Sequence, residues 1–89
     1  MENIPEIAKK LLKISCEYHQ NSGMENLFIP VAEIVNLYQE KEGTQPEKNF
    51  YLALEFLEER KFIRVKKRTF TRMPDLFDIT ANGFEEVNT

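Results

Sequence analysis

The sequence predicts an α+β fold in which three helices precede an antiparallel β-hairpin and a short last helix. Two observations support this class. Apolar residues recur every three or four positions in the first two thirds of the chain, and after Lys61 they alternate with charged residues. A chain of 89 residues can form one hydrophobic core, so we expect a single domain over residues 1–89.

The first helix is predicted from about Pro5 to Gln20. Proline is favoured in the first helical turn, which places Asn3 or Ile4 just before the helix. An apolar stripe consists of Ile7, Leu11, Ile14 and Tyr18, and the opposite side carries Lys9, Lys13, Glu17 and Gln20. We expect the helix to end at residues 21–23.

Two more helices follow a short apolar segment at residues 27–29, which is long enough only for a short strand. The second helix is predicted at residues 30–41 and ends at Gly43. Thr44 and Glu47 match a capping box, so the third helix is predicted from about Gln45 to Lys61. One face of each helix is apolar: Val31, Ile34, Val35 and Tyr38 in the second, and Phe50, Ala53, Leu54 and Leu57 in the third.

The remaining segment predicts two strands and a short helix. Ile63 and Val65 alternate with basic residues, and Phe77 and Ile79 flank an aspartate, so both strands have one polar face. Residues 69–74 form the predicted hairpin tip, and Thr80 caps a helix over 82–87. The predicted core is Ile7, Leu11, Ile14, Tyr18, Ile34, Val35, Phe50, Leu54, Leu57, Ile63, Val65, Phe77 and Ile79.

Composition narrows the class of protein. The chain has 12 Lys and Arg against 15 Asp and Glu, a net charge of −3, and 42% hydrophobic residues, which is typical of soluble globular proteins. No apolar run approaches the roughly 18–20 residues of a membrane span. Lysines interrupt the first fifteen residues, so these residues do not resemble a signal peptide. We therefore expect a cytoplasmic protein without membrane contact.

Few residues are suited to catalysis or metal binding. The single cysteine, Cys16, excludes an intrachain disulfide and a cysteine-based zinc site, and His19 is the single histidine. The sequence contains no phosphate-binding glycine loop. A chain this short also encloses little substrate. We therefore expect no enzyme activity, no metal site and no cofactor.

Basic residues are concentrated in one stretch. Seven lie between Arg60 and Arg72 with no acidic residue among them, although the chain as a whole is acidic. Such a cluster suits phosphate groups, because Lys and Arg displace condensed counterions from DNA. The alternative is a solvated edge hairpin, whose cations discourage pairing with other strand edges. Arg60 and Lys61 have a further explanation, since cations are favourable near a helix C-terminus.

Two stretches resemble the winged helix-turn-helix: ALEFLEERKFIRV at 53–65 and FDITANGFEEV at 77–87. The first is similar to the end of the recognition helix and the first wing strand of bacterial regulators of the PadR and MarR type. The second is similar to their second wing strand, which leads into a last helix through Thr-x-x-Gly. The resemblance covers essentially the whole chain and departs from the pattern at Lys61, where glycine is usual, so we expect a less tight turn there.

The resemblance implies a small transcriptional regulator that binds double-stranded DNA sequence-specifically. The third helix enters the major groove and the hairpin contacts the backbone. The residues expected in the groove are Lys48, Asn49, Tyr51 and Leu52. Those expected on phosphate or in the minor groove are Lys66, Lys67, Arg68 and Arg72. A homodimer is expected, with the first and last helices at its interface.

The alternative function is a winged-helix module that binds protein within a larger assembly. Leu52 and Phe56 form an apolar pair, four residues apart, on the side of the third helix that should face solvent. Glu55 and Glu59 lie on the same side and would be repelled by phosphate. Phe56 either folds back toward the wing or the first helix, or it forms with Leu52 a surface that contacts another protein.

Overall fold

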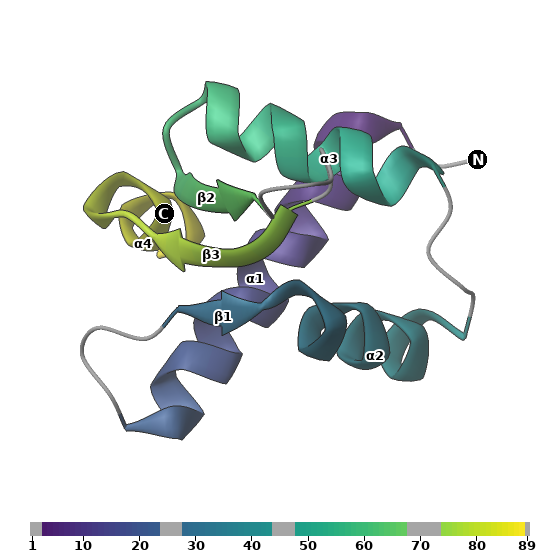
Figure 1. Cartoon of the computed structure of the whole chain (residues 1–89), viewed down its shortest axis with the longest axis horizontal. Coiled ribbons are helices and arrows are strands. Elements are labelled where there is room, and N and C mark those ends of the chain that lie inside the picture. Colours follow the sequence, from purple (N-terminus) through teal and green to yellow (C-terminus); the bar gives the residue numbers. More distant parts are fainter. Residues whose placement is uncertain (1–2, 24–27, 44–47, 68–73, 89) are drawn as a thin grey trace.

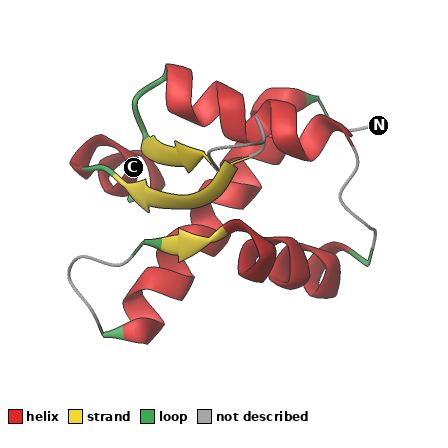
Figure 2. Ribbon diagram, in the orientation of Figure 1, coloured by secondary structure: helices red, strands yellow, loops and turns green. Residues whose placement is uncertain are grey.

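A computed structural model of the chain describes residues 3–23, 28–43, 48–67 and 74–88. Within these ranges the chain forms four helices and a three-stranded antiparallel sheet. This α+β layout is compatible with a winged helix. In Figures 1 and 2, α3 lies at the top and α2 at the bottom right, the strands lie in the middle and on the left, and α1 passes behind them.

Helix α1 spans Ile4–Ser22 and begins with a side-chain cap. The side chain of Asn3 accepts a hydrogen bond of 2.9 Å from the amide of Glu6. The helix is longer than predicted because the left-handed residue that ends it is Gly23, with φ 71°. Its buried face is also wider than the predicted stripe and includes Leu12 and Cys16, because α1 contacts α2, α3 and α4.

Helix α2 spans Val31–Glu42 and ends at Gly43, which has φ 72°. Two ion pairs join it to α1: Lys10–Glu42 at 3.0 Å and Lys41–Glu17 at 2.7 Å. The hydrogen bond and charge of Lys41 lower the pKa of Glu17. Both pairs are partly exposed to solvent, so their contribution to stability is small.

Helix α3 spans Lys48–Glu59 and is shorter than predicted at its C-terminal end. Phe50 and Leu54 point into the core, and the ring of Phe50 lies edge-on to that of Tyr38, 5.8 Å away. The predicted capping box, Thr44 and Glu47, lies outside the described residues.

The sheet contains β1 (Ile29–Pro30), β2 (Ile63–Lys67) and β3 (Pro74–Ile79) in the order β1-β3-β2. Both pairings are antiparallel, and Phe77 of β3 lies between Ile29 and Val65. Ile29, Ile63, Phe77 and Ile79 are buried on the inner face, as the alternation in β2 and β3 predicted. The predicted hairpin tip lies outside the described residues except for Pro74, which begins β3.

The turn from α3 into β2 differs from the prediction. Lys61 adopts the left-handed conformation with φ 63°. The amides of Lys61 and Phe62 donate hydrogen bonds of 3.0 Å to the carbonyls of Glu58 and Leu57. These two bonds are those of a Schellman motif, which usually has glycine at the left-handed position. The expectation of a less tight turn is therefore wrong, because the lysine adopts the backbone conformation that glycine usually supplies.

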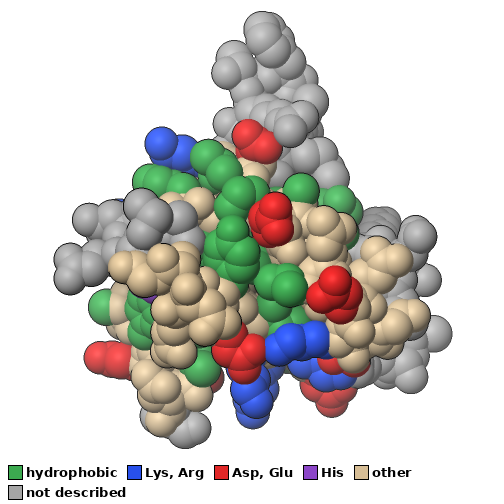
Figure 3. Space-filling view, turned by 90° about the horizontal axis from the view of Figure 1, so that it is seen from below, with side chains coloured by type: hydrophobic (Ala, Val, Ile, Leu, Met, Phe, Trp, Pro, Cys, Tyr) green, Lys and Arg blue, Asp and Glu red, His purple; other side chains and the backbone are tan. Residues whose placement is uncertain are grey.

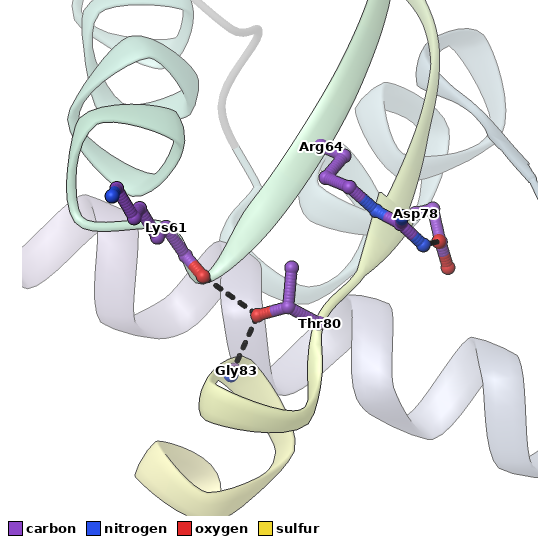
Figure 4. Close-up of polar contacts among 5 residues, drawn as sticks. All are labelled: Lys61, Arg64, Asp78, Thr80 and Gly83. Carbon is purple, nitrogen blue, oxygen red and sulfur yellow. Dashed lines mark hydrogen bonds and ion pairs between the residues drawn. The ribbon is translucent and has the colours of Figure 1, made fainter.

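Helix α4 spans Ala81–Val87 and is capped by Thr80, as predicted. The Thr80 hydroxyl accepts from the amide of Gly83 at 3.2 Å and donates to the carbonyl of Lys61 at 2.7 Å (Figure 4). A side chain at position 83 would place its Cβ 2.3 Å from the carbonyl oxygen of Phe62. The Thr-x-x-Gly motif thus has two physical roles: a cap and a close approach of backbones.

The core combines residues from all these elements. Every predicted core residue is buried except Tyr18, Val35 and Val65, which are half-buried and packed against it. The buried residues absent from the predicted core are Ala8, Leu12, Ser15, Cys16, Ile29, Val31, Tyr38, Ala53 and Gly83. The Ser15 hydroxyl donates to the carbonyl of Leu11 at 2.7 Å, which satisfies the polar group in that position.

Candidate nucleic-acid interface

The N-terminal end of α3 carries the residues predicted to contact bases. Lys48 is the first residue of α3, and its side chain lies outside the described part of the structure. Asn49 follows and is half-buried. An asparagine amide in the first turn of such a helix can pair with adenine, since it offers one donor and one acceptor.

Tyr51 and Leu52 are less accessible than the prediction requires of base-contacting residues. Both side chains are half-buried. The ring of Tyr51 lies edge-on to Phe50 at 5.4 Å and packs against the core, so part of it is committed to the interior. Among the described side chains predicted for the major groove, Tyr51 is therefore the one with an aromatic contact to the core. Asn49 and Leu52 are half-buried beside it.

Lys66 lies on the outer face of the sheet and is exposed. Its ammonium is 4.5 Å from the centre of the Phe28 ring, which is 41% exposed. Phe28 precedes β1, and Lys66 is in β2, so the contact spans the width of the sheet across β3. A cation above an aromatic face gains about 0.5–1 kcal/mol at an exposed site and keeps its charge. The contact therefore holds Lys66 on this face without neutralising it.

The other predicted phosphate contacts are only partly described. Lys67 is the last residue of β2, and its side chain lies outside the described part of the structure. The pairing of β2 with β3 shifts between Lys66 and Lys67, an irregularity that bends the strand. Arg68 and Arg72 lie outside the described residues.

Two further cations of the basic stretch have partners within the protein. Arg64 lies directly opposite Asp78 on β3, and their side chains form an ion pair (Figure 4). Asp78 offsets the charge of Arg64, so this arginine contributes less to a positive surface than the sequence suggested. The guanidinium of Arg60 lies 4.9 Å from the centre of the Phe56 ring.

Phe56 is half-buried and packs against the core. It lines a groove between α1, α3 and α4, and so lies toward the first helix, one of the two directions predicted for it. Leu52 is half-buried one turn earlier on the same helix. The apolar pair predicted at these positions is therefore only partly accessible.

Charge is mixed on the face of the molecule that includes α2, at the bottom of Figure 1. Figure 3 shows a band of hydrophobic side chains there, with acidic and basic side chains beside it. Glu33 and Glu40 of α2 are exposed. Carboxylates at these positions make the α2 side of the molecule less suited to phosphate.

The described residues contain no cluster of three or more His, Cys, Asp or Glu side chains that could hold a metal ion. Burial, with a smaller contribution from the charge of Glu17, raises the pKa of Cys16 to about 11, so its thiol is protonated at neutral pH. His19 packs edge-on against Phe84 of α4 at 5.1 Å. Within the described ranges, no helix is both long and apolar enough to cross a bilayer.

Phe28 and Asp78 affect the candidate interface in ways that the sequence analysis missed. The sequence shows both only as positions in or beside strands. Their effects depend on the pairing of β3 with β1 and β2, which brings Phe28 under Lys66 and Asp78 opposite Arg64. The alternation of Phe28 with Ile29 is the one local signal that places the Phe28 ring on the outer face.

The chain was compared with protein-family models, with curated proteins and with solved structures, and none of them matches it.

Proposed function

We propose that the chain is a winged helix-turn-helix domain that binds double-stranded DNA as a small transcriptional regulator. The observation that carries this proposal is the order of elements combined with the charge pattern. A helix pair, α2 and α3, is followed by an antiparallel hairpin, and seven basic residues lie between Arg60 and Arg72 without an acidic one.

The two parts have different roles in this proposal. Lys48 and Asn49 at the start of α3 contact base edges, with Tyr51 and Leu52 beside them in the major groove. Lys66, Lys67, Arg68 and Arg72 contact phosphates, which position the domain but carry no base information. The Phe28 ring supports this role for Lys66, because it holds the ammonium on the outer face of the hairpin.

A symmetric dimer is part of the proposal, since one small domain covers a short site and two related domains read two half-sites. The first test is binding of a labelled duplex of random sequence at about 50 mM salt, followed by fluorescence anisotropy. We expect saturable binding that weakens as salt rises. Absence of binding would contradict the DNA-binding function and favour the protein-binding module.

A further inference from the structure

A groove of about 400 Å³ lies between the first half of α1, the C-terminal end of α3, and α4. The residues proposed to contact DNA do not line it. Its floor is apolar, since Ala8, Leu12 and Leu57 line it and are almost completely buried. Phe56 and Val87 form half-buried parts of its walls. The groove is large enough to accept apolar side chains from another molecule.

The charged residues that line this groove are mostly basic. Lys9, Lys13 and Arg60 line it and are exposed, and Glu86 is the acidic residue among them. Within the described ranges, neither Lys9 nor Lys13 forms an ion pair, whereas Lys10 and Lys41 on the neighbouring faces do. Arg60 is held at the groove by its contact with the Phe56 ring.

The spacing of the two lysines suggests the shape of the occupant. Lys9 and Lys13 are four residues apart on α1, so they lie on one side of the helix about 6 Å from each other. Carboxylates at positions i and i+4 of a second helix have the same spacing. A helix that carries these carboxylates beside a separate stripe of apolar residues can insert the apolar stripe and pair its carboxylates with the lysines.

We propose that this groove docks an acidic amphipathic helix of a partner protein. The helix packs its apolar side chains on the half-buried Phe56, Phe62 and Val87 and pairs its carboxylates with Lys9 and Lys13. Arg60, on the opposite wall of the groove, binds a further carboxylate of the docked helix. This docking is independent of the proposed DNA contacts, and it requires the proposed dimer to form through surfaces outside the groove.

The test uses a displayed library of helical peptides of about 16 residues, selected on the whole chain. The proposal predicts enrichment of peptides with an apolar stripe and carboxylates at i and i+4. An enriched peptide, labelled and followed by anisotropy, should bind the Lys9→Glu, Lys13→Glu double variant at least about tenfold more weakly than the parent. The same peptide with lysines in place of those two carboxylates should regain affinity for the double variant.

Lys61→Glu is the matched control, because Lys61 is exposed and does not line the groove. It should leave the affinity for the enriched peptide unchanged. Equal losses in the double variant and the control would overturn the proposal, as would enriched peptides that lack the acidic pattern. The proposal would also be overturned if the parent sediments as a dimer and the double variant as a monomer, because a second copy of the chain then occupies the groove. Saturable binding of decanoate without peptide enrichment would assign the groove to a small amphiphile instead.

Discussion

The hydroxyl of Thr80 donates a hydrogen bond of 2.7 Å to the carbonyl oxygen of Lys61. The same hydroxyl accepts the amide of Gly83, so one side chain joins the end of α3 to the start of α4. The amide of Thr80 also donates to the carbonyl of Phe62 at 3.0 Å. Together these bonds determine where β2 leaves α3 and therefore where the basic hairpin lies.

Replacing Lys61 by glycine should stabilise the protein. A non-glycine residue in the left-handed region costs about 1–2 kcal/mol, and the φ of Lys61 is 63°. Glycine removes this strain but loses more chain entropy on folding, about 0.5–1 kcal/mol. We expect the free energy of unfolding in urea to rise by about 0.5–1 kcal/mol. Lys61→Ala removes the same charge and keeps the strain, so an equal gain in both variants would contradict this account of the turn.

Gly83→Ala should destabilise the protein although alanine favours helix formation. The added Cβ would lie 2.3 Å from the carbonyl oxygen of Phe62 and 2.8 Å from a methyl of Ile79. The helix or the strand must shift, and overpacking of this kind costs about 1–3 kcal/mol. Asn82→Ala is the control, because Asn82 is exposed in the same helix. If Gly83→Ala unfolds at the same temperature as the Asn82→Ala control, no close contact exists at position 83.

Local signals in the sequence predicted the fold well where one residue determines the outcome. Thr80 caps α4, Gly43 ends α2, and the alternation around Ile63 and Phe77 places these residues inside. These features depend on the chemistry of single residues and on the period of the chain.

Features that depend on distant contacts were predicted less well. Leu12 and Cys16 are buried because α1 is surrounded by three other helices, which widens its apolar face beyond one stripe. The Phe28–Lys66 contact depends on the pairing of β1 with β3, and the Arg64–Asp78 pair depends on the register of the hairpin. No local pattern predicts these pairings, and the Arg64–Asp78 pair makes the candidate interface less positive than the sequence suggested.

Stability should fall at alkaline pH because of Cys16. Its pKa is raised from 9.0 to about 11 in the folded protein, so above pH 9 the unfolded chain loses a proton that the folded chain retains. The resulting stabilisation of the unfolded state grows until the pH reaches about 11. Urea unfolding at pH values across this window should show a steeper decline for the parent than for Cys16→Ala. Parallel declines would indicate that Cys16 does not titrate differently on unfolding.

Replacement of both Lys48 and Asn49 by alanine should reduce discrimination between a selected site and random duplex. The expected loss is about 1–3 kcal/mol for each base contact removed, measured as the ratio of the two affinities. Affinity for random DNA should fall much less, because the hairpin cations remain. An unchanged ratio would remove the start of α3 from the base-reading role even if the protein still binds DNA.

The dependence of duplex affinity on salt tests the proposed phosphate contacts most directly. Lys66, Lys67, Arg68 and Arg72 are replaced together by glutamine, and Lys61→Gln serves as the control outside the hairpin. For each of the four residues that contacts a phosphate, the slope of log K against log salt should become shallower by about 0.9. The control should keep the parent slope. The proposed DNA-binding hairpin would be contradicted if the parent has no measurable affinity for duplex DNA at about 50 mM salt. It would also be contradicted if the quadruple glutamine variant retains the slope of the parent.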